Sequence, residues 1–337
     1  MITKIIGVGG MGINFINYMI KEKIKKVEYI TIDTNLKNSE SSLANQKIFL
    51  DTGIAKCSRE QVEKIAFQCY GQFYELLKDT NILFLISGVG GATGSGITPI
   101  ILEVAKKLKI FTITIIARPF FLEGFDVMKI ANDGMRKIEK LTDSLIIIPN
   151  EKLYNYIDKR EPLNSAYWQA NMLIKEGIES VVSILTEVGF MNIDLLDIRA
   201  VLDRSRDTII RVGEGFGETA GENILAQIKK KNLFEGQIQD AKRVLISFTT
   251  GNDVPLLDIQ KIIQGITNII KDKNFKLIWG IIINSSYEFN RKIKTVMISS
   301  EQWKMYKFTN FWMLLFWKFF IFILDFFVFL VLSKFLW

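Results

Sequence analysis

The residues Gly90-Gly91-Ala92-Thr93-Gly94-Ser95-Gly96 separate an apolar strand, Asn81–Ser87, from a helix expected over Thr98–Leu108. Closely spaced glycines leave backbone N–H groups free to surround an anion, and the Thr93 and Ser95 hydroxyls can add donors. The following helix directs its positive end at the same loop. No Gly-Lys-Ser/Thr follows, so this is not the lysine-bearing phosphate loop. All seven residues are therefore predicted to bind the phosphates of a nucleotide.

An earlier glycine-rich segment, Gly7-x-Gly9-Gly10-x-Gly12, lies between a strand over Lys4–Val8 and a helix over Asn14–Ile24. Glycine suits this place because a Cβ would keep the backbone away from phosphate oxygens. Asp33 follows at the end of a second strand, at the spacing typical of dinucleotide-binding proteins. Taken alone, the pattern also fits an NAD-dependent oxidoreductase that uses Gly7, Gly9, Gly12 and Asp33, although that interpretation has no evident catalytic base and leaves residues 90–96 unexplained.

Apolar strands alternate with helices through the first half of the chain. Beside those already given, strands are expected at Val27–Ile32, Phe111–Ile116 and Ser144–Ile148, and helices at Gln61–Lys78 and Met128–Lys140. Strands that are apolar throughout belong to parallel sheets covered on both faces, and right-handed crossovers make such a sheet doubly wound. The predicted fold class is α/β, with a doubly wound parallel-sheet nucleotide domain.

A long helix over Ser165–Glu187 and a second, smaller α/β domain are expected to follow. The second domain has strands at Thr208–Val212, Arg243–Thr249, Lys276–Ile283 and Lys292–Ile298, with helices at Thr219–Lys230 and Leu257–Lys271. We therefore expect a nucleotide domain at 1–162, a central helix and acidic loop at 163–204, the second α/β domain at 205–300 and a hydrophobic tail at 301–337.

The composition limits the chemistry. The sequence has no histidine, which removes the commonest general base, the serine–histidine and cysteine–histidine nucleophiles and most zinc sites. Its two cysteines, Cys57 and Cys69, make no disulfide framework and suit a reducing cytosol. The formal charge of +7 is spread as scattered lysines, so no nucleic-acid partner is expected.

The segment Asn192-Ile193-Asp194-Leu195-Leu196-Asp197 carries the remaining candidate chemistry. Read locally, it is a helix N-cap with acidic residues in the first turn. Read functionally, Asp194 and Asp197 are groups able to orient or polarise a water in a chain without histidine, with Asn192 assisting.

Together these motifs resemble the FtsZ family of tubulin-like GTPases. The resemblance extends from Met1 to about Ser300 and includes both glycine segments, Arg118-Pro119-Phe120 with Glu123-Gly124, Ile148-Pro149-Asn150, Ala166-Tyr167 and Asn192-x-Asp194-x-x-Asp197. It implies a GTP-hydrolysing, cytoplasmic protein of cell division that stacks head to tail into filaments at the division site. It also implies that the catalytic residues Asn192, Asp194 and Asp197 of one subunit complete the site of the next.

The resemblance further implies which residues hold GTP or GDP, with Mg²⁺ accompanying the nucleotide. Glu123 would contact the ribose, Tyr167 would stack on the base, and Asn150 and Asn171 would face its edge. The predicted nucleotide contacts are Gly9, Gly10, Met11, Gly12, Asn14, Gly90, Gly91, Ala92, Thr93, Gly94, Ser95, Gly96, Glu123, Asn150, Tyr167 and Asn171.

Several positions depart from the family pattern. Met11 and Ile13 stand where the family has more glycine, Leu50–Ser58 lacks a Gly/Ala-rich phosphate-sensing loop, Phe125-Asp126-Val127 replaces a basic residue, and Asn171 stands where aspartate is usual. Asparagine offers one acceptor and one donor to guanine, where aspartate offers two acceptors. The missing sensing loop and basic residue support an alternative function, a nucleotide-binding scaffold with little or no hydrolysis.

The C-terminal tail also departs from the family, which ends in a linker and a short partner-binding peptide. Phe311–Leu332 contains only two charges, Lys318 and Asp325, and is about as long as the roughly 20 residues that cross a bilayer. A membrane anchor, a non-native end and a helix that packs on a partner all remain open. Membrane or division-protein partners are therefore expected, if at all, through this tail.

Overall fold

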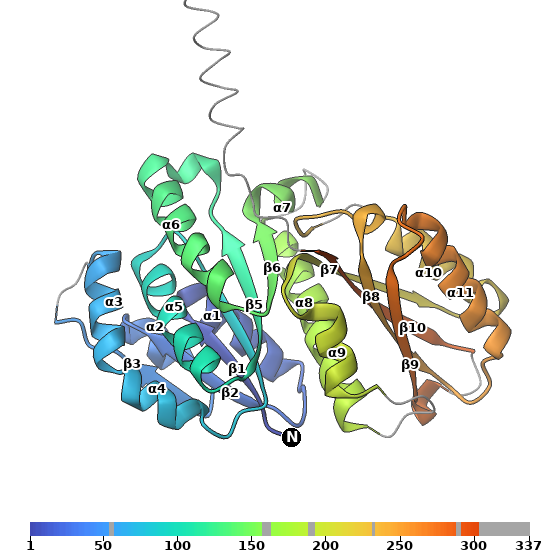
Figure 1. Cartoon of the computed structure of the whole chain (residues 1–337), viewed down its shortest axis with the longest axis horizontal. Helices are drawn as coiled ribbons and strands as arrows, with labels where there is room; N and C mark the ends of the chain where they lie inside the picture. Colours follow the sequence, from blue (N-terminus) through green and yellow to red (C-terminus); the bar gives the residue numbers. More distant parts are fainter. Residues whose placement is uncertain (54–56, 157–162, 188–192, 231–232, 288–290, 303–337) are drawn as a thin grey trace, which may run out of the picture. The chain divides into compact units, whose positions relative to one another are not determined.

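The computed structural model describes residues 1–53, 57–156, 163–187, 193–230, 233–287 and 291–302, and the described part forms one compact unit within 1–302 (Figure 1). Residues 303–337, which contain the apolar tail, lie outside the described residues. Within the described ranges, no helix is both long and apolar enough to span a bilayer.

The first six strands form a parallel sheet in the order β3-β2-β1-β4-β5-β6. Along β1, Ile5 faces one hydrophobic core and Ile6 the other, because successive side chains of a strand point to opposite faces. This explains why the strands are apolar throughout, as the sequence predicted. Their bounds are β1 Thr3–Val8, β2 Glu28–Asp33, β3 Gln46–Phe49, β4 Ile82–Gly88, β5 Phe111–Arg118 and β6 Ser144–Pro149.

Helices cover both faces of this sheet, which confirms the doubly wound prediction. Helices α1 and α8 contribute to the core on one face, and α3, α4, α5 and α6 contribute to the core on the other. The helices of this part are α1 Gly9–Lys21, α2 Leu36–Ser41, α3 Arg59–Gln68, α4 Tyr70–Leu77, α5 Ala92–Lys107, α6 Phe125–Leu141 and α7 Asn150–Tyr156.

The helix predicted over Gln61–Lys78 is wrong in one respect, because two helices, α3 and α4, occupy this stretch. Cys69 stands between them, and its N–H is shared by the carbonyls of Ile65 and Ala66, a pattern common at helix ends. Helices α2 and α7 were not expected from the pattern, because each is too short to show a helical period.

Helix α8 (Leu163–Thr186) follows, and after it come α9 (Leu195–Leu202) and the remaining strands. Strands β7 to β10 extend the sheet in the order β7-β10-β8-β9. Strand β10 pairs antiparallel with β7 and β8, and β8 pairs parallel with β9. The bounds are β7 Ser205–Gly215, β8 Arg243–Thr250, β9 Lys276–Ile283, β10 Ile293–Gln302, α10 Ala220–Ile228 and α11 Leu256–Ile269.

The two sets of strands are joined by a single residue pair, Ser144 on β6 and Ser205 on β7. The second set has its own hydrophobic core, built from β8, β9, β10, α10 and α11. This arrangement confirms the predicted fold class, a parallel-sheet nucleotide domain, a long central helix and a smaller second α/β part. The exact boundaries at 162, 204 and 300 stay a prediction.

Candidate functional site

A cavity of about 670 Å³ opens where the parallel strands β1, β4, β5 and β6 end. Ligands of open α/β sheets bind at this edge, and the volume lies within the range of small-molecule sites, roughly 300–1,000 Å³. The cavity draws its lining from the starts of α1, α5, α7 and α8. The lining residues are Val8, Gly9, Gly10, Met11, Asn14, Phe15, Gly88, Val89, Gly91, Ala92, Thr93, Gly94, Ala117, Pro119, Glu123, Asn150, Tyr167 and Asn171.

Two helix N-termini meet at this cavity. Helix α1 begins at Gly9 and α5 begins at Ala92, so both glycine segments are helix starts with only short loops before them, which corrects the longer loops expected. Neither helix has a side-chain cap, and neither has an acidic residue in its first turn. Their first N–H groups and the positive ends of both dipoles therefore suit an anion such as phosphate.

The glycines of these segments serve two different purposes. A Cβ on Gly91 would have nothing within 4 Å, and Gly91 lines the cavity. A Cβ on Gly94 would lie 2.0 Å from the Gly88 carbonyl oxygen, and one on Gly12 would lie 2.7 Å from the Ile86 carbonyl oxygen. Gly94 and Gly12 are thus required for close packing of helix on strand, a role that the phosphate interpretation did not anticipate.

Four of the predicted nucleotide contacts, Gly12, Gly90, Ser95 and Gly96, do not line the cavity. Gly90 has a φ of +103°, and its N–H donates to the buried Ser95 Oγ at 3.0 Å. A Cβ on Gly96 would lie 3.1 Å from the Arg59 carbonyl oxygen of α3. These residues therefore support the loop and the start of α5 from the side away from the cavity. The Ser95 hydroxyl oxygen accepts a hydrogen bond from the Gly90 N–H.

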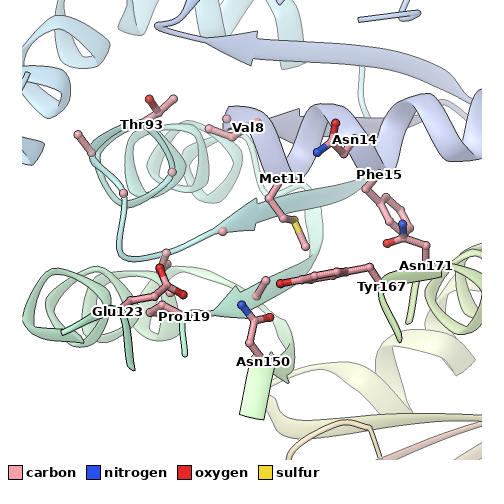
Figure 2. Close-up of a pocket in the computed structure, with 18 residues that line it drawn as sticks. Val8, Met11, Asn14, Phe15, Thr93, Pro119, Glu123, Asn150, Tyr167 and Asn171 are labelled. Atoms are coloured by element: carbon pink, nitrogen blue, oxygen red, sulfur yellow. The ribbon is translucent and has the colours of Figure 1, made fainter. Parts of the chain in front are cut away.

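The opposite end of the cavity carries an aromatic ring and two amides. Figure 2 shows the Tyr167 ring extending from α8 into the cavity toward Met11 and Asn150. Burial, with a further contribution from Glu123, raises the pKa of Tyr167, so its hydroxyl stays protonated. The Asn150 Oδ1 atom is buried and has no hydrogen-bond partner among the described residues. An unpaired buried acceptor in a cavity indicates a missing ligand donor.

Glu123 is the single charged residue among the 18 lining residues. It ends the 3₁₀ turn η1 (Phe121–Glu123), and its Oε1 accepts the Phe120 N–H at 2.8 Å. No lysine or arginine is among the described residues that line the cavity, in agreement with the basic residue missing after Gly124. Thr93 contributes a hydroxyl, which lies 2.6 Å from the Thr34 hydroxyl.

Six lining residues were not predicted: Val8, Phe15, Gly88, Val89, Ala117 and Pro119. Val8, Gly88 and Ala117 are at or next to the ends of β1, β4 and β5. The carboxyl ends of parallel strands mark the ligand edge, so this position in the fold could have identified them. Phe15 carries no such signal, because it reads as a core residue of α1.

The acidic segment forms a reciprocal cap at the start of α9. The Asp197 N–H donates to Asp194 Oδ1 at 2.8 Å, and the Asp194 N–H donates to Asp197 Oδ2 at 3.3 Å. The local interpretation as an N-cap is confirmed, and Asp194 is exposed. Neither aspartate lines the cavity of its own chain. Asn192 lies outside the described residues.

The acidic segment and the cavity are at opposite edges of the sheet. Helix α8 has 24 residues, so it is about 36 Å long at 1.5 Å per residue. Tyr167 near its start lines the cavity, whereas the Thr186 carbonyl at its end accepts a hydrogen bond from Lys26 Nζ at 3.0 Å, just before β2 begins. Figure 1 shows α8 running from the α7 end of the sheet toward the end where the chain begins.

Asp33 does not support the dinucleotide interpretation. It is 2% exposed and does not line the cavity. Its Oδ1 accepts the Asn35 N–H at 2.9 Å and its Oδ2 accepts the Asn38 side-chain amide at 3.0 Å. The carboxylate therefore anchors the start of α2, and no ribose contact follows from its position.

Comparisons with known proteins agree with the resemblance seen in the sequence. Residues 2–158 match the Tubulin/FtsZ family, GTPase domain, and residues 207–301 match the FtsZ family, C-terminal domain. The chain is 34% identical over 273 residues to the cell division protein FtsZ of Pseudomonas putida, covering 78% of this chain and 69% of that protein. It is 31% identical over 301 residues to that of Buchnera aphidicola, covering 88% and 78%.

Solved structures show the same fold. An empty FtsZ dimer of M. jannaschii superposes with a TM-score of 0.77 at 24% identity and covers 92% of this chain and 94% of that one. A point mutant of FtsZ from M. jannaschii superposes with a TM-score of 0.77 at 25% identity, covering 89% and 91%.

Proposed function

The chain belongs to the FtsZ family of tubulin-like cell-division GTPases, and from this premise we propose that it binds and hydrolyses GTP while stacking head to tail into filaments. One observation carries the proposal. The cavity with two uncapped helix starts lies at one edge of the sheet, and the paired aspartates lie at the other, beyond a helix about 36 Å long. A copy stacked on the next would bring the two half-sites together.

We assign the phosphates to the helix-start end of the cavity and guanine to the amide end. Backbone N–H groups at the starts of α1 and α5 would hold the phosphates, with the Thr93 hydroxyl beside them. Tyr167 would stack on the base, and Asn150 Oδ1 would accept from a guanine N–H. Asn171 would face the same edge, and Glu123, with one oxygen uncommitted by Phe120, would accept from the ribose.

The acidic segment of the next copy would supply the chemistry. Asp194 and Asp197, with Asn192, would orient a water whose oxygen attacks the terminal phosphorus, releasing phosphate and GDP. A bound Mg²⁺ would neutralise phosphate charge, which the described lining of this cavity, without a cation, does not do itself. The chain itself would hold the phosphates through the helix dipoles and backbone N–H groups at the starts of α1 and α5.

The same head-to-tail arrangement defines the partner and the place of action. The partner is a further copy of this chain, and the place of action is the cytoplasm at the division site. We keep the boundaries 1–162, 163–204 and 205–300 for the three parts. Membrane or division-protein contacts through 301–337 rest on the sequence alone, because that segment lies outside the described residues.

The decisive experiment measures GTP hydrolysis per chain against protein concentration. A site divided between copies predicts a rate that rises steeply with concentration and then saturates. A rate per chain that stays constant at every concentration would contradict the shared site. Mixing two impaired variants sharpens the test, at a GTP concentration too low to fill the weakened cavity of Gly91→Asp: Asp197→Ala chains keep the cavity, and Gly91→Asp chains keep the acidic segment. Random stacking restores a complete site at about one interface in four, so activity should return in the mixture.

A second function, a nucleotide-binding scaffold without hydrolysis, is favoured by one observation. No cation among the described lining residues is placed to stabilise charge that develops on the phosphates. Under this alternative, the protein would pellet with GTP at high concentration, and the bound nucleotide would remain GTP. Release of stoichiometric phosphate under the same conditions would exclude it.

A further inference from the structure

Two exposed apolar side chains stand next to a cavity-lining residue in the chain. Leu122 in η1 is 96% exposed, and Phe125 at the start of α6 is 68% exposed. Glu123 lies between them in the chain and lines the cavity (Figure 2), so both side chains stand within two residues of the cavity lining. Large apolar side chains grouped on a surface mark interaction sites. The Leu122 side chain packs against almost nothing in its own chain.

A second exposed leucine lies inside the acidic segment. Leu196 is 71% exposed and stands between Asp194 and Asp197 in the first turn of α9. Leu195 packs against the core, and Ile198 is fully buried in it, so the inward face of α9 is complete without Leu196. The fold of the single chain therefore gives no reason for a leucine at this position.

We infer that Leu196 of one copy packs against Leu122 and Phe125 at the cavity rim of the next, as the apolar contact of the head-to-tail interface. The inference rests on the proposed function, because it takes the second copy as the partner. Each apolar group adjoins one half of the divided site. Stacking that delivers Asp194 and Asp197 to the cavity would also carry the leucine between them toward the cavity that Glu123 lines.

The contact is heterologous, so its two halves are different surfaces of the chain. Leu122 and Leu196 each remove apolar area from water only when copies stack. Full burial of one exposed leucine tightens association by roughly tenfold to a hundredfold. An apolar contact also adds no charge to an interface where the negatively charged aspartates would already face the negatively charged phosphates.

The first experiment is a double-substitution cycle in the full-length chain. Leu122→Ser and Leu196→Ser should each raise the protein concentration for half-maximal GTP hydrolysis and for pelleting by about tenfold or more. Because the two side chains meet, the second substitution should add much less than the first in the double variant. GTP binding by dilute protein should stay unchanged in all three variants.

The matched control is Leu256→Ser. Leu256 is 56% exposed, begins α11 and lies in the second part of the fold, away from both halves of the site. This substitution replaces the same type of exposed side chain at a helix start and should leave the assembly concentration unchanged. An equal shift in this control would mean that general solubility, and not the proposed contact, sets the concentration.

A cross-linking experiment tests the geometry directly. In a background with Cys57→Ser and Cys69→Ser, chains with Leu122→Cys are mixed with chains with Leu196→Cys and treated with a short bismaleimide and GTP. The contact predicts covalent dimers in the mixture and none in either population alone or in the background. Cross-links within the Leu122→Cys population alone would show a like-to-like contact and overturn the inference.

The two proposals fail in different ways. If wild-type hydrolysis rises with concentration but the two leucine substitutions are additive, or the mixture gives no covalent dimer, the apolar contact is wrong and the divided site stands. Unchanged assembly in Leu122→Ser would also overturn the contact and would suit a rim covered by another segment, such as residues 303–337. A wild-type rate that is independent of concentration removes the proposed function itself.

Discussion

The starts of α5 and α9 are the same kind of element with opposite electrostatics. At α5 the N-cap Gly91 supplies no side-chain acceptor, and the first turn has no acid, so its N–H groups face the cavity. At α9 two aspartates occupy the cap and satisfy each other's backbone N–H groups. The first start attracts a phosphate, and the second would repel one. The two ends of the molecule are therefore complementary in charge, and neither could take the place of the other.

The largest expected effect comes from removing a carboxylate at α9. Asp197→Ala should lower the GTP turnover number by about 10²–10⁴-fold, because an oriented water loses the group that polarises it. GTP binding should persist, since the residue lies outside its own cavity. The helix should lose about 1 kcal/mol of stability with half of its capping box. Single-turnover hydrolysis at saturating protein measures the first effect, and urea unfolding the last.

Asp197→Asn is the matched control for that prediction. Its amide oxygen can still accept the Asp194 N–H, so the cap should survive while the charge is lost. Turnover that recovers in the asparagine variant would assign the residue a structural role only and would contradict the catalytic one.

The next effect tests the packing side of the α5 start. Gly94→Ala should destabilise folding by about 3 kcal/mol, because its Cβ would lie 2.0 Å from the Gly88 carbonyl oxygen and 2.6 Å from Ser87 Oγ. Gly91→Ala, which meets open space, should change the free energy of unfolding by less than about 0.5 kcal/mol. Equal losses in thermal or urea unfolding would erase the distinction between packing and cavity-facing glycines.

A smaller effect follows from making the α5 start resemble the α9 start. Gly91→Asp should weaken GTP binding by about tenfold or more, because a carboxylate would face the phosphates. Stability should rise by a few tenths of a kcal/mol, since aspartate is a better N-cap than glycine. Gly91→Asn gives the cap without the charge and should bind GTP more tightly than the aspartate variant. Equilibrium titration with a fluorescent guanine nucleotide would measure both.

The smallest effect concerns Asp143, which lies near the C-terminal half of α9. Burial raises its pKa, although the Thr112 N–H and hydroxyl bond to its Oδ2. A raised pKa stabilises the fold below the ordinary value and loses that contribution as pH rises through the folded-state value. Asp143→Asn should therefore gain slight stability over the wild type at pH 7 and none in acid.

Urea unfolding at both pH values measures the Asp143 effect. Asp51→Asn is its control, since Asp51 is exposed and also accepts a backbone N–H. A gain of the same size in both variants would attribute it to the amide and not to burial of Asp143.

The sequence predicted the layers better than the roles of single residues. Apolar strands and helical spacing identified the doubly wound sheet, because burial on both faces dictates composition. The helices were predicted to begin at Asn14 and Thr98, but they begin earlier, at Gly9 and Ala92. The sequence pattern does not distinguish a glycine-rich loop from a glycine-rich first turn of a helix. Gly12 and Gly94 were interpreted only as phosphate contacts, because the sequence pattern does not show that each would press against the end of a strand, Gly12 against Ile86 of β4 and Gly94 against Gly88 of the same strand.

The candidate site was predictable where the family motif names the residue and unpredictable where the fold alone selects it. Asn150, Tyr167 and Asn171, for which the resemblance implies contacts to the base, line the cavity. Phe15 does so because α1 presents one of its core positions to the same space. Asp33 is the opposite case, because it matches a sequence motif but does not belong to the site. Its two carboxylate oxygens accept hydrogen bonds from Asn35 and Asn38.

Helix α8 gives the proposed assembly a length scale. Its start lines the nucleotide cavity and its end leads to the aspartates. In a stack of copies, its length would therefore set the distance between one nucleotide and the next. With α8 along the stacking axis, successive nucleotides would be separated by about the helix length, roughly 36 Å. Inserting one turn into α8 would lengthen the axial repeat of the filament, a spacing that its diffraction pattern would report.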